Sequence, residues 1–321
     1  MRALCFSDFG GPEVLEYREV PDPPVGEGEA LIRTRAIGLN FADVYRRRGN
    51  YHLTGTPPWI AGYEAAGEIV EAPPGSGLVA GQRVAFADSP HANAELVAVA
   101  VDRLVPLPDD VGFDTAAALL LQGMTAQYLV RDSHRLQRGE TTLVHSAAGG
   151  VGGLLSQIAR RIGARVLGVT SSPAKRERAL AAGADAVALY DEDWVARARA
   201  FGAEGAGVDV AFDAVGSTLL DSLDAVRTGG HVVFYGMAGG EPPPVPPRLL
   251  MDTSKSLTGG DLWNVLRTAT DRRTRADELF EWVRAGALAV EIAARFPLAE
   301  GAQAHALLES RQVVGKLLLI P

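Results

Sequence analysis

Cysteine is almost absent from this sequence, and long apolar runs are absent altogether. Cys5 is the only thiol among 321 residues, which excludes an internal disulfide and a structural zinc site built on three or four thiolates. No stretch of about eighteen consecutive apolar residues occurs, and residues 1–9 lack the apolar run of a signal sequence. We therefore expect a cytoplasmic protein that has no membrane partner.

Positive charge is scarce as well. The chain has 31 lysines and arginines against 39 acidic residues, which gives a formal net charge of −8. The resulting field repels polyanions, which argues against nucleic acid as a partner. The chain is rich in apolar residues, with 47% hydrophobic and 22% charged residues, as is typical of a globular protein with a substantial core.

Metal-ligand patterns are missing too. The histidines stand singly at positions 52, 91, 134, 145, 231 and 305, with no close pair of the kind that zinc motifs supply. We therefore predict no metal site. Without a Lewis acid to polarise a ketone or alkoxide, simple alcohol oxidation is disfavoured, and an acceptor that takes up hydride readily is needed.

The chain changes character near residue 121. Before that point, short β-like runs separated by glycine and proline clusters predict turn-rich antiparallel structure. These runs fall at 30–36, 67–71, 83–87 and 94–99. After that point, apolar strands alternate with helical stretches, which indicates parallel βαβ units. We predict an α/β protein with a β-rich, barrel-like module and a doubly wound parallel sheet.

The elements expected in the parallel part alternate regularly. Strands are predicted at 141–146, 165–170, 186–189, 208–212, 231–235 and 256–258, and helices at 150–162, 173–182, 192–201 and 218–226. Residues 262–284 look largely helical, and the chain ends with strands at 290–297 and 315–320 around a helix at 298–310. We expect residues 122–261 to form one domain, and 1–121 with 262–321 to form the other.

A glycine-rich loop follows the first of these strands and opens a helix. The segment from His145 through Gly149, Gly150 and Val151 to Gly152 has the context in which such a turn holds a pyrophosphate, with helix N–H groups facing the anion. The first glycine of the usual fingerprint is Ala147 here. A tight strand-to-helix turn without a ligand is the alternative reading, but the βαβ context favours dinucleotide binding.

The end of the second strand indicates which dinucleotide binds. An acidic residue at this position usually accepts from the ribose hydroxyls of NAD, and none is present. The strand ends with Thr170, Ser171 and Ser172, and Lys175 and Arg176 follow, so hydroxyls and positive charge are offered to a phosphate instead. NADPH is therefore favoured over NADH, although the two basic residues have an alternative reading as an ordinary solvated pair.

Several motifs in order resemble the zinc-free quinone oxidoreductases, the zeta-crystallin-like group of the medium-chain dehydrogenase/reductase superfamily. The motifs are Gly10-Gly-Pro-Glu-Val-Leu15, Ala36-Ile-Gly-Leu-Asn-Phe-Ala-Asp43, Gly62-Tyr-Glu-Ala-Ala-Gly67, Gly123-Met-Thr-Ala126, Ser146-Ala-Ala-Gly-Gly-Val-Gly152 and the closing run that starts Val314-Gly-Lys-Leu317. The resemblance implies a GroES-like catalytic domain, a Rossmann dinucleotide-binding domain and a homodimer. The unpaired apolar edge near residues 256–258 would be a plausible contact between the two copies.

The resemblance also implies roles for single residues. Asn40 and Tyr45 would face the nicotinamide end, and Thr125 would lie near the phosphates or the nicotinamide ribose. The pyrophosphate would be held by Gly149, Gly150, Val151 and Gly152, and the 2′-phosphate would be surrounded by Ser171, Lys175 and Tyr190. The nicotinamide would lie beside Phe234, Tyr235 and Gly236. Arg311 would approach the cofactor. Considered alone, Asn40 reads as a cap, Tyr190 as a core aromatic and Arg311 as a surface charge.

In zinc-binding relatives a Cys stands near Asn40 and a His stands at the position of Tyr63, so the resemblance is to the branch without the metal. Asp43 is expected to stabilise the first turn of a helix. The segment from Gly259 to Trp263 departs from the Thr-Arg-Pro-like element of the nearest relatives, which leaves the acceptor less defined than the cofactor.

A quinone suits such a site because the hydroquinone anion needs no dedicated acid, so positioning dominates. The main rival is the reduction of α,β-unsaturated ketones or enoyl thioesters, in which the α-carbon must be protonated. Tyr51 stands where the related enoyl thioester reductases carry a proposed proton donor, and its other reading is that it lines the cleft. A third hypothesis, a structural or RNA-binding protein that binds NADPH, is opposed by the acidic charge.

Overall fold

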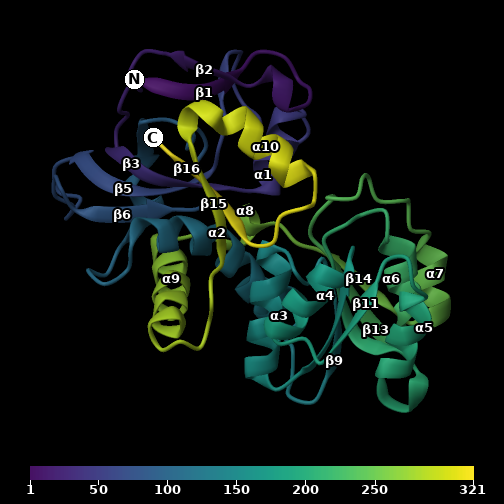
Figure 1. Ribbon diagram of the computed structural model, residues 1–321. Helices are drawn as coiled ribbons and strands as arrows, with labels where there is room; N and C mark the ends of the chain where they lie inside the picture. The colour runs from purple at the N-terminus through teal and green to yellow at the C-terminus, as the bar shows by residue number, and fades with distance from the viewer. The chain divides into compact units, whose positions relative to one another are not determined.

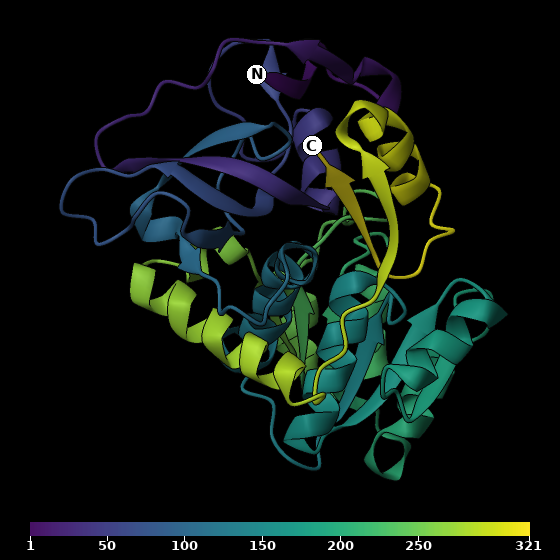
Figure 2. The same cartoon turned by 60° about the vertical axis from the view of Figure 1, so that its left-hand side comes forward.

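The computed structural model describes residues 1–321, which form two compact units. One unit consists of Met1–Leu121 and Leu266–Pro321, and the other of Gln122–Val265. Both ends of the chain therefore belong to the same unit, as the colours of Figures 1 and 2 show. The sequence predicts that the chain returns to the first domain between residues 261 and 262, whereas in the structure this boundary falls after Val265. No helix in either unit has the length and apolar character required to cross a bilayer.

The first unit is built around a seven-stranded, mainly antiparallel sheet. Its order is β15-β16-β3-β5-β6-β8, with β7 paired to β3. The strands are β3 (Glu29–Leu39), β5 (Glu64–Glu71), β6 (Arg83–Phe86), β7 (Leu96–Ala100), β8 (Val105–Pro106), β15 (Ile292–Pro297) and β16 (Lys316–Ile320). β16 runs antiparallel beside the end of β3, with Leu318 opposite Gly38. The last strand of the chain therefore lies next to the residues that precede Asn40.

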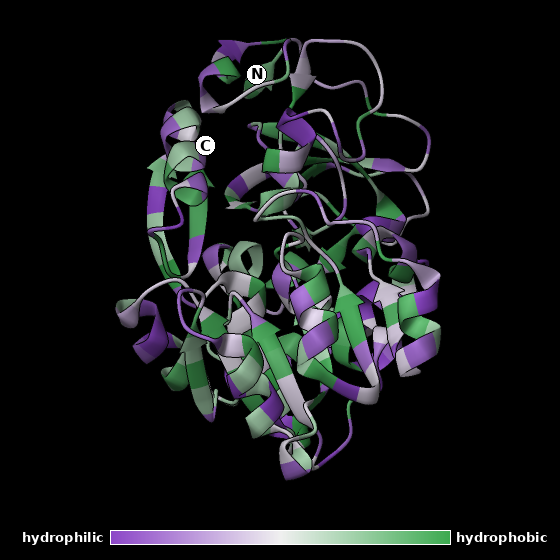
Figure 3. Ribbon diagram, turned by 90° about the vertical axis from the view of Figure 1, so that its right-hand side faces the viewer, coloured by the Kyte–Doolittle hydropathy of each residue, from purple (hydrophilic) through white to green (hydrophobic).

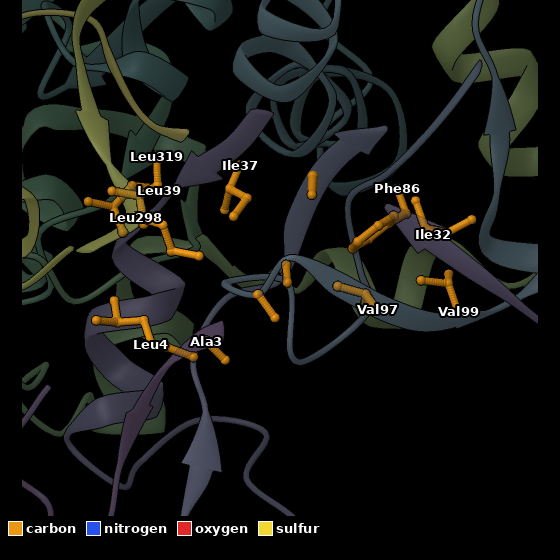
Figure 4. Packing of buried hydrophobic residues seen from close by; sticks show 14 of the residues in the cluster. Ala3, Leu4, Ile32, Ile37, Leu39, Phe86, Val97, Val99, Leu298 and Leu319 are labelled. Atoms are coloured by element: carbon orange, nitrogen blue, oxygen red, sulfur yellow. The ribbon is translucent and has the colours of Figure 1, made fainter. Parts of the chain in front are cut away.

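A smaller sheet and four helices complete this unit. The sheet has the order β2-β1-β4, formed by β1 (Arg2–Phe6), β2 (Glu16–Glu19) and β4 (Trp59–Ile60). The helices are α1 (Phe41–Arg47), the first part of α2 (Phe113–Tyr128), α9 (Ala269–Arg284) and α10 (Gly301–Glu309). Figure 4 shows part of the apolar core, to which Leu4, Ile32, Val97 and Leu319 contribute from four different strands.

The second unit is a six-stranded, wholly parallel sheet with helices between its strands. Its order is β11-β10-β9-β12-β13-β14, formed by β9 (Thr141–His145), β10 (Arg165–Thr170), β11 (Ala186–Leu189), β12 (Val208–Asp213), β13 (Val226–Phe234) and β14 (Ser256–Gly259). The helices are α3 (Gly150–Ile162), α4 (Pro173–Ala181), α5 (Trp194–Phe201), α6 (Leu219–Ala225), α7 (Pro247–Thr253) and α8 (Leu262–Val265). The strands are mostly hydrophobic and the helices mixed (Figure 3), as expected for a sheet covered on both faces.

The strand order reverses around β9. β10 and β11 lie on one side of β9, and β12, β13 and β14 lie on the other, because the chain crosses back after β11. In open parallel sheets, ligands bind at the carboxyl ends of the strands where the order reverses. The glycine-rich loop that follows β9 stands at this position.

Most predicted elements are present, and the differences have physical causes. The predictions for β10, β11 and α3 match to the residue. The helical range predicted at 262–284 is instead two helices, because Thr268 caps a new one by accepting from the N–H of Asp271. Helix α2 was not predicted, since residues 116–120 are buried all round and show no helical period.

Candidate functional site

The loop between β9 and α3 contains glycines at positions where an added side chain would crowd neighbouring atoms. A Cβ on Gly152 would lie 2.3 Å from the carbonyl oxygen of Ser146, and one on Gly150 would lie 2.1 Å from the side chain of Gln122. Gly149 donates its N–H to Ser146 at 2.7 Å and is the N-cap residue of α3, where no side chain caps the helix. The first-turn N–H groups of α3 are therefore not occupied by a side-chain cap, which is the arrangement that binds phosphate.

Tyr190 is tied to the start of this loop. It follows β11, and its hydroxyl oxygen accepts from the backbone N–H of Ser146 at 3.1 Å while Nδ1 of His145 lies 3.1 Å away. The Tyr190 and His145 rings are stacked at 14°, with centroids 5.8 Å apart. Tyr190 thus packs against the apolar core of the second unit and also holds the start of the loop.

Ser171 and Lys175 lie together at the end of β10. Lys175 Nζ donates to Ser171 Oγ at 3.1 Å, and Ser172 caps α4. Arg176 was expected to add positive charge here, but it pairs with Glu192, which also binds Arg197 at 2.7 Å. The combination of a hydroxyl and an ammonium group therefore consists of Ser171 and Lys175.

A buried network that the sequence did not reveal joins β9 to β12. His145 Nε2 lies 2.9 Å from Ser222 Oγ, and that hydroxyl donates to Asp213 Oδ2 at 2.7 Å. Burial lowers the pKa of His145 and so keeps it neutral. Burial alone would raise the pKa of Asp213, but hydrogen bonds from the Ser222 hydroxyl and two backbone N–H groups hold it below its usual range. The network fixes the ends of the two strands that flank the reversal.

The segment after β13 is anchored to the same strand end. Phe234 is the last residue of β13, and Tyr235 donates its N–H to the carbonyl of Asp213 at 2.9 Å. Gly236 passes close to Ala214, because a Cβ on Gly236 would lie 3.0 Å from the Ala214 carbonyl oxygen. β9 and β12 separate these residues from β10, so the structure does not bring them together with Ser171 and Lys175.

In the first unit, Asn40 lies in a buried network of charged groups. Its backbone N–H donates to Asp43 Oδ2 at 2.7 Å, and its side-chain amide donates to Glu64 Oε2 at 2.8 Å. Lys316 Nζ donates to Glu64 Oε2 and to Asn40 Oδ1, both at 2.6 Å. Glu64 Oε1 accepts from the N–H of Leu121 at 2.7 Å. A buried ion pair therefore fixes the orientation of the Asn40 amide.

Asp43 caps α1 as expected, and its burial has a further effect. Burial raises the pKa of Asp43 to about 7, although the Asn40 N–H and the charge of Lys316 act in the opposite direction. Glu64 adds to the rise by repulsion. This carboxyl therefore changes charge near neutral pH.

The remaining candidates lie apart from the two networks described above. Tyr45 of α1 meets Tyr51 edge to face, with ring centroids 5.9 Å apart. Thr125 is a buried residue of α2, and Val151 is half-buried in the first turn of α3. Arg311 lies exposed between α10 and β16, in the left-handed region at a φ of 58°.

Two histidines that stand far apart in the sequence meet in the second unit. His134 Nδ1 lies 3.0 Å from His231 Nδ1, and His134 Nε2 lies 3.2 Å from Glu140. No periodic pattern links positions 97 residues apart, so sequence reasoning could not have found the pair. The chain contains no group of three or more His, Cys, Asp or Glu side chains arranged to hold a metal ion.

Comparison with known proteins places this geometry in a family. Residues 26–140 match the alcohol dehydrogenase GroES-like domain, and residues 150–275 match the zinc-binding dehydrogenase family. The chain is 41% identical to the quinone oxidoreductase of Pseudomonas aeruginosa over 100% of its own length and 99% of that protein. The chain belongs to the quinone oxidoreductase family. This confirms the resemblance to the zeta-crystallin-like group of medium-chain dehydrogenases and reductases.

Two further relatives of this chain are named for the reduction of different substrates. The 2-haloacrylate reductase of a Burkholderia species is 35% identical over 97% of this chain and 96% of that protein. The crystal structure of Escherichia coli quinone oxidoreductase complexed with NADPH has a TM-score of 0.96 and 34% identity, covering 100% of both chains. The predicted combination of a GroES-like domain and a Rossmann-type domain is therefore confirmed, and this family member is an oxidoreductase.

Proposed function

We propose that the protein is an NADPH-dependent quinone reductase that works without a metal. The observation that carries this proposal is the uncapped start of α3 behind the loop at 146–152, at the point where the strand order reverses. Bound NADPH supplies the reducing equivalents. The protein binds the nucleotide, orients it and holds the acceptor, and the full-length similarity to quinone reductases supports this assignment.

The proposed cofactor contacts follow the second unit's strand ends. Gly149, Gly150, Val151 and Gly152 hold the pyrophosphate through backbone N–H groups. The Ser171 hydroxyl would donate to the 2′-phosphate and the Lys175 ammonium would neutralise it at the end of β10, with the Tyr190 ring beyond the end of the neighbouring strand β11. Phe234, Tyr235 and Gly236 contact the nicotinamide, and Thr125 contacts the nicotinamide ribose or the phosphates.

The first unit supplies the proposed catalytic residues. Asn40 and Tyr45 act at the nicotinamide end, where the amide fixed by Glu64 and Lys316 offers a hydrogen bond of set direction. Arg311 approaches the cofactor from the C-terminal segment. Residues 1–121 and 262–321 thus act as the catalytic domain and residues 122–261 as the nucleotide-binding domain.

A second function, reduction of an activated carbon–carbon double bond, is favoured by the similarity to the 2-haloacrylate reductase. That reaction requires a proton at the α-carbon, and Tyr51 carries the hydroxyl proposed to supply it. The Tyr51 ring is half-buried beside Tyr45, a placement that suits both a donor and a residue lining the acceptor.

A panel of acceptors separates the two functions. We expect NADPH oxidation to be fastest with benzoquinones and naphthoquinones, slower with enones and enoyl thioesters, and slower throughout with NADH. Tyr51→Phe should retain quinone turnover and, if Tyr51 is the donor, should lower enone turnover by about 100-fold. Tyr17→Phe, which removes a hydroxyl from β2, is the matched control. Faster turnover of enones than of quinones by the unmodified protein would reject quinone reduction as the main activity.

We also propose that the protein is a cytoplasmic homodimer that acts on small molecules and binds neither nucleic acid nor membranes. β14 is an edge strand of the parallel sheet, and the neighbouring helix α7 exposes Leu249 and Met251. A second copy pairing along β14 would cover both features. Light scattering should give about twice the chain mass of 33.8 kDa, and a monomer at micromolar concentration would refute the dimer.

A further inference from the structure

Two consecutive arginines of α1 are fully buried, and their surroundings differ. Arg47 forms an ion pair with Glu309 and donates to the carbonyl of Gly10 at 3.1 Å. Arg46 has no carboxylate partner: its Nη1 donates to the backbone carbonyl of His52 at 2.9 Å and to the hydroxyl of Tyr63 at 3.3 Å. Its Nε and Nη2 atoms have no hydrogen-bond partner. A buried guanidinium that no carboxylate contacts is costly to desolvate, so the groups that Arg46 does contact must hold it in place.

Tyr63 acts on the same short segment as Arg46. Its side chain is 1% exposed, and its hydroxyl faces the carbonyls of Tyr51 and His52 at 3.1 and 3.3 Å. The Arg46 guanidinium lies 5.3 Å from the centroid of the Tyr63 ring, in cation–π geometry. Two consecutive carbonyls are therefore held from the protein interior by two side chains that also contact each other.

The segment that is held has no regular structure of its own. It connects α1 to β4, and its backbone is in the left-handed region at Gly49 and at His52, where φ is 40°. A non-glycine residue is strained in the left-handed region, so other contacts must hold its backbone there. The carbonyl contacts of Arg46 and Tyr63 fall at His52 and at the residue before it.

The same contacts determine where the Tyr51 ring lies. Tyr51 meets Tyr63 edge to face, with centroids 6.0 Å apart and planes at 89°, and it meets Tyr45 in the same manner. The Tyr63 hydroxyl thus holds the backbone of Tyr51 while the Tyr63 ring supports its side chain.

We propose that Arg46 and Tyr63 are positioning residues that fix the segment 49–53 so that the Tyr51 ring is presented to the acceptor in one orientation. The inference rests on the proposed function for its consequence, since a loop already ordered lowers the entropy lost when an acceptor binds. The pair therefore acts on acceptor affinity and not on binding of the nucleotide.

The decisive variant is Tyr63→Phe, which removes the hydroxyl and keeps the ring under Arg46. We expect faster amide hydrogen exchange within residues 49–53, a KM for the quinone raised by about tenfold with little change in kcat, and an unchanged Kd for NADPH. In a Tyr51→Ala background the KM effect of Tyr63→Phe should disappear, because the ring to be positioned is gone. Arg46→Lys keeps the charge and should recover part of the effect of Arg46→Met, and Tyr17→Phe is the matched control.

Each outcome bears on the inference. Unchanged hydrogen exchange at residues 49–53 in Tyr63→Phe would overturn it, and so would a KM change of equal size in the presence and absence of the Tyr51 ring. Hydrogen exchange requires no turnover, so it decides whether the carbonyl contacts hold the loop even if quinones are not the acceptor. Failure of the proposed function would instead appear as a lack of quinone turnover in the unmodified protein.

Discussion

The loop after β9 and the network around Asn40 are both candidate parts of the active machinery, but they are built differently. The loop consists of adjacent residues, and Gly152 is required by its close approach to the carbonyl oxygen of Ser146, six residues earlier in the chain. The Asn40 network joins residues up to 276 positions apart. A phosphate cradle made of backbone N–H groups is encoded locally, whereas a side-chain amide is oriented by charges that only the complete fold brings together.

The two regions also differ in electrostatics. The loop relies on partial charges at the start of α3 and on a histidine that burial keeps neutral. The first unit instead buries formal charges on Glu64, Lys316 and Arg46. We therefore expect the loop to be sensitive to added volume, and the Asn40 network to be sensitive to loss of a charge or to pH.

Removing one member of the buried ion pair should have the largest effect. Lys316→Met leaves Glu64 charged and without its counter-ion, and we expect a loss of about 3–5 kcal/mol in the free energy of unfolding. Urea unfolding measures this loss. The double variant with Glu64→Gln should recover much of it. Arg295→Met, which breaks the exposed pair with Asp114, should cost less than about 1 kcal/mol. Equal losses in the free energy of unfolding for Lys316→Met and Arg295→Met would contradict the expected difference between a buried and an exposed ion pair.

Added volume in the loop should have the next largest effect. Gly152→Ala forces a Cβ to within 2.3 Å of the Ser146 carbonyl, so the loop must move, and we expect NADPH affinity to fall by about 100-fold. Gly153→Ala is a matched control one residue later, because its Cβ would lie 3.7 Å from its nearest neighbour. Titration of nucleotide fluorescence gives both affinities. Similar affinities for the two variants would show that the loop shape does not set binding.

Titration of Asp43 should give a smaller effect with a defined sign. Its pKa rises from 3.8 to about 7 on burial, so the folded protein binds this proton more tightly than the unfolded chain does. The stabilisation is complete below about pH 4 and is lost as the pH rises through about 7. Asp43→Asn keeps an oxygen for the Asn40 N–H and removes the titration.

Unfolding of both proteins in urea at several pH values tests this sign. The stability of the unmodified protein relative to Asp43→Asn should fall by on the order of 2 kcal/mol between about pH 5 and pH 7. His91 and His305, whose pKa values burial lowers to about 4 and about 3, contribute with the opposite sign but are common to both proteins. If the stability of the unmodified protein relative to Asp43→Asn rises or stays constant with pH, Asp43 does not titrate with a raised pKa in the folded protein.

The local features were predictable from sequence. The glycine loop, helix α3 and strand β10 were predicted because glycine requirements, capping and hydrophobic period act over a few residues. The placement of Ser171 beside Lys175 followed from a strand end and one helical turn. The roles assigned to these residues stay predictions.

The tertiary features were not predictable. Lys316 is the first residue of the apolar strand β16, and in the sequence it looks like an ordinary charged residue until β16 pairs with β3. Arg46 looks like one charge in an exposed arginine run, yet it is fully buried. The contacts of His145 with Ser222 and of His134 with His231 depend on strand order, which no local pattern in this sequence specifies.

A phosphate-bearing nicotinamide nucleotide is proposed to bind at the loop after β9 without help from a metal. The most direct test is the pair of dissociation constants for NADPH and NADH, measured by titration on protein treated with a chelator. We predict that NADPH binds at least about tenfold more tightly than NADH, through Ser171 and Lys175. Equal affinities, or NADPH binding that the chelator abolishes, would contradict the account.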